Sequence, residues 1–221
     1  MHPRMAERHR AFTLVELLVV IAIIAILVGL LFPALKGVQN QARSTQAKND
    51  LTQIVNAVNA FYTDYGKYPL VTADTTYGPG GMANNLLVTV LRATESTPTN
   101  NPRQVVFISP PSVKNPTNPK SGIALQATTI NGISVAVGDL VDPWGTPYNV
   151  RIDGGYDNSV ANPYGAQNVG GAGSDPVPLG VIAWSRGNDQ ALGTRISGIT
   201  GDNIYRNPTT GAQSDDVISW Q

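Results

Sequence analysis

The chain contains no cysteine, and its two histidines, His2 and His9, both lie before residue 10. The absence of thiols excludes disulfide bonds, thiolate metal sites and cysteine nucleophiles. Most zinc sites, catalytic triads and histidine acid–base pairs need an imidazole, and the sequence offers none after His9. We therefore expect that this protein is not an enzyme.

Net charge is also absent. The 15 acidic residues balance the 15 basic ones, and charged residues make up only 14% of the chain. A protein that binds nucleic acid broadly needs a basic surface, and this balance gives no sign of one. We expect no nucleic-acid partner. The length of 221 residues suits one globular domain with an accessory segment.

A long hydrophobic run follows a short basic prefix. Every residue in 17–32 is apolar or glycine, and the 24 residues of 12–35 carry one charge, Glu16. A helix that spans a bilayer needs about 20 such residues. The sequence therefore predicts a transmembrane helix at 12–35, kinked near Pro33. The arginines of the prefix predict a cytoplasmic N-terminus with the remaining chain outside.

The helical pattern continues through a polar stretch into an amphipathic segment at 36–66. Its apolar residues recur at helical spacing, which places them on one face. They are Leu51, Ile54, Val55, Val58, Phe61, Tyr62 and Tyr65. Gly66 is a C-cap, and Pro69 prevents the helix from continuing.

After Tyr68 the pattern becomes that of short strands and loops. The expected elements are a helix at 82–93 and strands at 105–109, 147–153 and 180–185. Asn131-Gly132 lies between two β-branched runs in 124–137, which is typical of a tight hairpin. The predicted fold is α+β: one long N-terminal helix with a small antiparallel sheet in domain 67–221, packed on the second half of the helix.

Residues 11–35, AFTLVELLVVIAIIAILVGLLFPAL, resemble the prepilin-type cleavage and methylation segment of type IV pilins and type II secretion pseudopilins. The marks of that segment are a short basic leader, a small residue, and FTLVE before the apolar run. The resemblance implies that a prepilin peptidase removes the leader 1–11 by cutting between Ala11 and Phe12, and then methylates Phe12. This chain has Ala11 where the family usually has glycine.

Glu16 is a charge that an ordinary membrane anchor has no reason to carry. A carboxylate at the centre of a membrane helix costs about 2.5–3.5 kcal/mol, and less near an end, so it marks a function or a partner. In the family this glutamate is taken to pair with the amino terminus of a neighbouring subunit. The resemblance thus implies that Glu16 binds the amine of Phe12 in the next copy. Such a heterologous contact does not close and generates a filament.

The resemblance also implies a function. The expected protein is a structural pseudopilin with a single inner-membrane helix and a periplasmic domain. It assembles into a periplasmic filament that drives type II protein secretion. The expected partners are the prepilin peptidase, further copies of the chain, other pseudopilins, the inner-membrane assembly platform with its ATPase, and the outer-membrane secretin.

Several motifs of the C-terminal half are similar to those of the major pseudopilin of type II secretion. They are KYP at 67–69, DPWGTPY at 142–148, AWSRGNDQ at 183–190 and DDVISW at 215–220. The resemblance implies a structural Ca²⁺ held by Asp189, Asp215 and Asp216, with Ser214 as a helper. Carboxylate, hydroxyl and carbonyl oxygens are the ligands that calcium prefers. The loop between Asp189 and Asp215 is longer than in the family. Without any family, we expect Trp144 and Trp220 to pack in the core.

Two other functions stay open. A type IV pilin for adhesion, motility or DNA uptake would share the N-terminal segment, although such pilins often have a C-terminal disulfide loop that this chain cannot form. The outer domain would otherwise be a membrane-anchored glycan-binding module, with Tyr77, Tyr156 and Tyr164 as exposed stacking platforms. The alternative interpretation of these tyrosines is that they pack within turns.

Overall fold

The computed structural model describes residues 14–165, 172–193, 205 and 214–220, and for 30–34 it describes the backbone. The predicted leader 1–11 and its cleavage site at Ala11 and Phe12 lie outside the described residues. The chain divides into two compact units, one ending at Ala42 and the other beginning at Arg43. The boundaries at 35/36 and 66/67 stay predictions.

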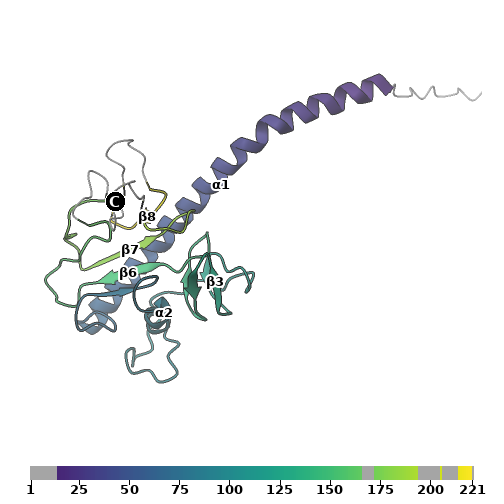
Figure 1. Cartoon of the computed structure of the whole chain (residues 1–221). Coiled ribbons are helices and arrows are strands. Elements are labelled where there is room, and N and C mark those ends of the chain that lie inside the picture. Colours follow the sequence, from purple (N-terminus) through teal and green to yellow (C-terminus); the bar gives the residue numbers. More distant parts are fainter. Residues whose placement is uncertain (1–13, 166–171, 194–204, 206–213, 221) are drawn as a thin grey trace, which may run out of the picture. The chain divides into compact units, whose positions relative to one another are not determined.

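Helix α1 runs from Leu14 to Tyr65 (Figure 1). The helical backbone continues through Pro33, and the kink predicted there stays a prediction. The helix ends as its sequence indicates. Gly66 has φ of +68°, and its N–H donates to the carbonyl of Tyr62 at 2.8 Å. Glycine adopts this conformation without the penalty that a Cβ would bring.

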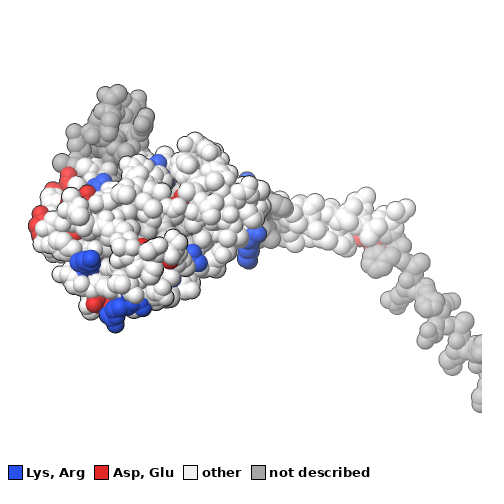
Figure 2. All heavy atoms as spheres, turned by 90° about the horizontal axis from the view of Figure 1, so that it is seen from below, with Lys and Arg blue, Asp and Glu red and all other residues white. Residues whose placement is uncertain are grey.

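The first unit exposes the apolar side chains of α1. Leu14 is 86% exposed, and Ile26 is 64% exposed. Figure 2 shows this part of the helix almost entirely without charged side chains. In the part of the chain that the structure describes, no helix has an apolar stretch long enough to cross a membrane. The transmembrane helix predicted at 12–35 is therefore not confirmed.

The second unit contains a four-stranded antiparallel sheet in the order β1-β6-β7-β8 (Figure 1). Its strands are β1 (Thr75–Tyr77), β6 (Asn149–Ile152), β7 (Val181–Ser185) and β8 (Val217–Ile218). Two antiparallel pairs accompany it: β2 (Gly122–Ile123) with β5 (Leu140–Val141), and β3 (Thr128–Ile130) with β4 (Ile133–Val135). One short helix, α2, spans Asn84–Leu91. These elements confirm the α+β prediction.

The main core forms where the apolar face of α1 meets the sheet. Leu51, Val58 and Phe61 from the helix pack in one buried cluster with Val150 of β6 and Ala183 of β7. Full burial of an aliphatic or phenylalanine side chain stabilises a fold by about 1.5–3 kcal/mol. The predicted helix face is thus the face that is buried, although Tyr62 at its edge remains 40% exposed.

Two polar contacts join α1 to the strands of the same unit. The Lys48 ammonium donates to the Ile218 carbonyl at 2.6 Å, and the Tyr148 hydroxyl donates to Asp50 Oδ2 at 2.8 Å. Burial raises the pKa of the Asp50 carboxyl, and the bond from Tyr148 opposes this shift. Both bonds fix the register of the helix against the sheet, a property that apolar contacts alone specify less sharply.

One predicted strand is wrong. Residues 105–109 form no strand, because their backbone donors are used elsewhere: the N–H groups of Phe107 and Ile108 donate to the carbonyl of Leu91, at 2.8 and 3.3 Å. The segment covers the end of α2, where a carbonyl lacks its partner within the helix. The hairpin is confirmed. Asn131 and Gly132 have φ of +47° and +81°, as a type I′ turn requires.

Candidate functional site

Three carboxylates that are distant in sequence meet in the second unit. Asp189 follows β7, and Asp215 and Asp216 directly precede β8. Each offers one oxygen, and these oxygens lie within 4.8 Å of one another. Oxygens on opposite sides of a calcium ion are about 4.6–5.2 Å apart, since each Ca–O distance is about 2.3–2.6 Å. The cluster therefore has the size that a single calcium ion needs.

The backbone after β7 positions Asp215. Oδ2 of Asp215 accepts hydrogen bonds from the N–H groups of Asn188 and Asp189, the latter at 2.9 Å. Gly187, with φ of +65°, lets this loop approach, because a Cβ at residue 187 would collide with the Asp215 carbonyl. Asp189 is itself oriented by the N–H of Ala191, which donates to its Oδ1 at 2.9 Å. The two exposed carboxylates are thus held by peptide groups.

Asp216 is the buried member of the cluster, with 5% of its surface exposed. Its Oδ2 accepts hydrogen bonds from the Tyr164 hydroxyl at 2.8 Å and from the Gly193 N–H at 2.6 Å. Its Oδ1 is buried and has no hydrogen-bond partner among the described residues. Burial raises the pKa of this carboxyl to about 7, although those hydrogen bonds oppose the shift.

The unpartnered oxygen of Asp216 makes the residues fit a cation. A buried acceptor left without a donor costs about 1–3 kcal/mol or more for a charged group. A divalent cation between the three aspartates would satisfy it, since calcium takes carboxylate oxygens directly. Ser214 lies beside them, because its Oγ accepts the N–H of Asp216 at 3.2 Å. The structure thus brings together the three aspartates that the resemblance suggested as ligands, with Ser214 next to Asp216.

The support for Asp216 was missed by the sequence analysis. Tyr164 was considered as an exposed platform, yet it is 2% exposed and holds the Asp216 carboxylate. Gly193 carries no pattern that would mark its N–H as a donor to a residue 23 positions away. Only the NPYG turn composition around Tyr164 pointed to a packed residue.

The predicted glycan platform is wrong for two of its three tyrosines. Tyr77 and Tyr164 are buried in separate core clusters, so neither presents a ring to a ligand. Tyr156 is 49% exposed, but its ring stacks on Tyr68 at 5.6 Å between centroids. The alternative interpretation, that such tyrosines pack within turns, is confirmed for Tyr164, whereas Tyr77 packs in the core from strand β1.

Asp142 is a fully buried carboxylate that organises the DPWG turn. Its Oδ1 accepts the backbone N–H groups of Trp144, Gly145 and Thr146 at 2.9, 2.7 and 2.9 Å. Its Oδ2 accepts the hydroxyls of Thr146 and Ser185 at 2.7 and 2.6 Å. Burial raises the pKa of this carboxyl despite the bonds. All its hydrogen bonds are internal, so Asp142 has a structural role.

Trp144 and Trp220 contact the core as expected. Trp144 is buried, with 6% of its surface exposed. Trp220 is half-buried against a second cluster around Trp184, and its Nε1 donates to the Ala172 carbonyl at 2.6 Å. These contacts give the aromatic residues of the C-terminal motifs a structural role.

Glu16 lies in the first turn of α1 and is exposed. A carboxylate in the first turn of a helix interacts favourably with the positive end of the helix dipole. The position also places the charge next to the predicted cleavage point at 11/12 in the sequence. The long N-terminal helix with its early carboxylate and the α+β elements of the second unit are consistent with the pilin-like fold that the sequence predicts.

Comparison with known proteins finds similarity over part of the chain. Residues 8–32 match the prokaryotic N-terminal methylation motif. The chain is 36% identical to type II secretion system core protein G of Escherichia coli K12 over 66 residues. This aligned segment covers 30% of this chain and 46% of that protein. It is 30% identical to the type IV major pilin protein PilA of Myxococcus xanthus over 76 residues. This aligned segment covers 34% of this chain and 34% of PilA. Part of the chain is thus similar to pilins and to type II secretion pseudopilins.

The similarity is limited to part of each relative. A third relative, core protein G of Aeromonas hydrophila, is 37% identical over 63 residues, or 28% of this chain and 44% of that protein. The chain thus spans less than half the length of the curated relatives it matches. No solved structure matches the chain.

Proposed function

We propose that the chain is a pseudopilin subunit that assembles into a periplasmic filament for type II protein secretion. The observation that carries the proposal is the start of α1, where exposed apolar side chains surround one carboxylate, Glu16, within the methylation motif. A helix hydrophobic on all sides is stable only in lipid or among other helices. Residues 12–35 would therefore anchor the subunit in the inner membrane and then line the filament core.

The function would be mechanical. Cleavage before Phe12 creates an amine, and Glu16 of an incoming subunit neutralises the amine of its neighbour. Because this contact is heterologous, each subunit offers a free site to the next and the filament grows. Growth at the base moves the tip outward and pushes secreted proteins towards the outer-membrane secretin. The partners would be the peptidase, other pseudopilins, the assembly platform and its ATPase.

A type IV pilin is the second candidate, because PilA of Myxococcus xanthus matches over a similar length. The DPWG turn and the acidic pair Asp215–Asp216 favour secretion, since they resemble the motifs of the major pseudopilin. The location of the filament separates the two functions. Long extracellular fibres built from this chain would support a pilin, and short fibres confined to the periplasm would support a pseudopilin.

Processing tests the family function directly. We expect mass spectrometry of the chain from cells with a prepilin peptidase to find a mature N-terminus at Phe12 bearing one methyl group. Cells without the peptidase should keep the leader. Ala11→Gly should be processed equally, because it keeps a small residue, whereas Ala11→Phe should accumulate as precursor. A native chain that keeps residues 1–11 while assembling normally would contradict the proposal.

We further propose that Asp189, Asp215 and Asp216 hold a calcium ion with the help of Ser214. The ion would supply the positive charge that Oδ1 of Asp216 lacks and would link the segment after β7 to β8. A ligand that binds only the folded state stabilises it by about 2.7 kcal/mol at a hundredfold excess over its dissociation constant. The expected role is structural.

Removal of calcium tests this site. Chelation should lower the melting temperature of the full-length chain in detergent by about 5–10 °C, since 1 kcal/mol corresponds to about 2–4 °C at this size. Asp215→Asn should abolish the calcium response. The matched control is Asp157→Asn, an exposed aspartate outside the cluster, which should keep it. A melting temperature that is independent of calcium in the native chain would end the proposal without touching the filament function.

A further inference from the structure

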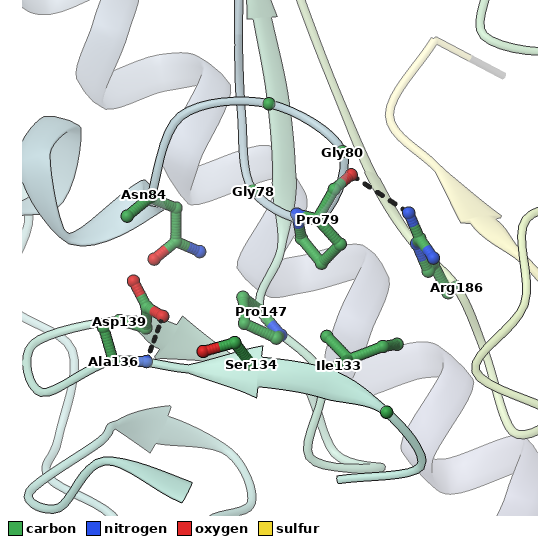
Figure 3. A pocket seen from close by; sticks show the side chains of 13 residues that line it. Gly78, Pro79, Gly80, Asn84, Ile133, Ser134, Ala136, Asp139, Pro147 and Arg186 are labelled. Atoms are coloured by element: carbon green, nitrogen blue, oxygen red, sulfur yellow. Dashed lines mark hydrogen bonds between the residues drawn. The ribbon is translucent and has the colours of Figure 1, made fainter. Parts of the chain in front are cut away.

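A cavity of about 370 Å³ opens on the second unit between the 78–81 loop and strand β4. This volume is within the range of natural ligand pockets. Figure 3 shows its arrangement: Pro79 and the loop on one side, Ile133 and Ser134 opposite, Asn84 and Asp139 towards one end, and Arg186 at the other. The three aspartates of the candidate cation site are not part of this lining, and the proposed function does not use the cavity.

The wall formed by β4 is an open strand edge. Asn131-Gly132 is a two-residue turn, so Ile130 and Ile133 form the hydrogen-bonded pair that closes it, and Thr129 and Ser134 form the next, non-hydrogen-bonded pair. The peptide N–H and C=O of Ser134 therefore point away from β3. Among the described strands, β4 pairs with β3 alone. Its second edge can accept another strand.

The opposite wall is held rigidly. Gly78 has φ of +105°, and a Cβ there would lie 2.9 Å from Cα of Asn149. The carbonyl of Pro79 accepts hydrogen bonds from Asn149 Nδ2 at 2.9 Å and from Arg186 Nη2 at 3.0 Å. A loop fixed at both positions keeps the cavity open before a ligand arrives, which reduces the ordering cost of binding.

The Asp139 carboxylate lies at one end of the cavity, and each of its two oxygens already accepts a backbone N–H. Oδ1 and Oδ2 of Asp139 accept the N–H groups of Asn85 and Ala136, at 2.9 and 2.7 Å. The side-chain amide of Asn84 is saturated by backbone groups of Leu140 and Tyr148. These side chains shape the cavity, and the Asp139 carboxylate repels an anion from that end.

The other end carries the cation. Arg186 is half-buried, and its described hydrogen bond, to Pro79, uses Nη2. Burial lowers the pKa of its guanidinium, which nevertheless stays charged at neutral pH. A partly desolvated guanidinium binds a carboxylate more strongly than an exposed one does. The cavity is thus polarised along the strand edge, from Asp139 to Arg186.

We propose that this cavity binds a short extended peptide that carries a carboxylate, by adding it as a strand to the free edge of β4. The Ser134 peptide group would pair with the peptide backbone, and Pro79, Ile133 and Pro147 would contact its side chains. Arg186 would bind the carboxylate and so set the direction of the peptide. Edge addition supplies affinity through the main chain, and the charged end supplies selectivity. The site does not depend on the filament function.

Fluorescence anisotropy on the full-length chain in detergent tests this proposal with three labelled peptides: Val-Thr-Val with a free carboxylate, its C-terminal amide, and Val-Thr-Asp amide. The free acid should bind, and the Val-Thr-Val amide should bind about tenfold or more weakly, because a hydrogen bond to a charged group is lost. Val-Thr-Asp amide distinguishes the sources of the carboxylate: binding shows that a side chain suffices, and failure shows that the C-terminus is required. Either result supports a carboxylate site.

Four variants identify the contacts. Arg186→Gln should make the acid and the amide bind equally, and Ser134→Pro should weaken every peptide about tenfold by removing the outward N–H. Thr129→Pro removes the corresponding N–H from the far edge of the hairpin, and Arg103→Gln removes a guanidinium elsewhere, so both should bind as the native chain does.

Melting temperatures check that each variant folds. The proposal is overturned if the acid does not bind at millimolar concentration, if acid and amide bind equally to the native chain, or if Ser134→Pro abolishes self-association of the chain instead of peptide binding.

Discussion

Glu16→Val should enter the membrane as well as the native chain but should appear in filaments about tenfold less. The substitution removes a carboxylate that costs up to about 2.5–3.5 kcal/mol in a membrane helix, so insertion should not suffer. It also removes the proposed partner of the amine at Phe12 in the neighbouring subunit. That amine would then be buried in an apolar filament core without a counter-charge, at a cost of several kcal/mol per contact.

Quantitative imaging and sedimentation of sheared filaments measure this effect, and membrane fractionation measures insertion. Glu7→Val is the matched control, because Glu7 belongs to the leader that the proposed cleavage would remove. It should assemble normally. Glu16→Asp should retain part of the assembly, since it keeps the charge on a shorter side chain. A normal filament yield from Glu16→Val would refute the pairing of Glu16 with Phe12, whereas a loss of insertion would show that the carboxylate serves the membrane helix itself.

Asp142→Ala should lower the free energy of unfolding by about 3–5 kcal/mol. The variant leaves three buried backbone donors and two hydroxyls, those of Thr146 and Ser185, without their acceptor. It also opens a small cavity beneath the DPWG turn, next to Trp144. The melting temperature should fall by about 10 °C or more, as measured by circular dichroism. The exposed Asp157→Ala should change stability by no more than about 0.5 kcal/mol.

Asp142→Asn separates the hydrogen bonds from the charge. Its oxygen keeps the three backbone donors, and the hydroxyls of Thr146 and Ser185 turn to accept from the new amide, so the loss should be about 1–2 kcal/mol. Burial raises the pKa of Asp142 above 3.8. A carboxyl with a raised folded-state pKa binds more protons when native, so its contribution to stability is full below about pH 4 and declines as the pH rises through the folded pKa.

Asparagine does not titrate, so the advantage of the native chain over Asp142→Asn should shrink as the pH rises from about 4 upward. Denaturant unfolding at several pH values in the presence of excess calcium measures this difference. An advantage that grows with pH would show that the hydrogen bonds outweigh burial and that the charged carboxylate is the stable form in the fold.

Much of the fold could be predicted because the signals are local. The apolar face of α1, the cap at Gly66 and the turn at Asn131-Gly132 each depend on neighbouring residues, and the structure confirms them. The strand predicted at 105–109 fails for the opposite reason. Its β-branched residues fit a strand, but the fate of its N–H groups depends on the end of α2, which lies elsewhere in the sequence.

The candidate site shows the same division. The resemblance pointed to Asp189, Ser214, Asp215 and Asp216, but not to Tyr164 and Gly193, which hold the Asp216 carboxylate. The cavity beside Arg186 was not predicted, although Pro147 and Arg186 of its lining lie in motifs of the C-terminal half. Its walls come from a glycine loop, a hairpin edge and a residue after β7, and these segments form a cavity only where the folded chain brings them together.

The sequence by itself determined which reactive side chains are absent and where the apolar run and its carboxylate lie. Lack of cysteine, histidine confined to the first residues, and one carboxylate at the head of an apolar run are properties of composition and order, which no packing can change. Tertiary structure decided which polar groups are buried and what they face. Tyr77 and Tyr164 became core residues, Asp216 kept an unpaired oxygen, and β4 kept an open edge. These outcomes depend on contacts between distant segments, because burial and hydrogen-bond satisfaction exist only once the chain has folded.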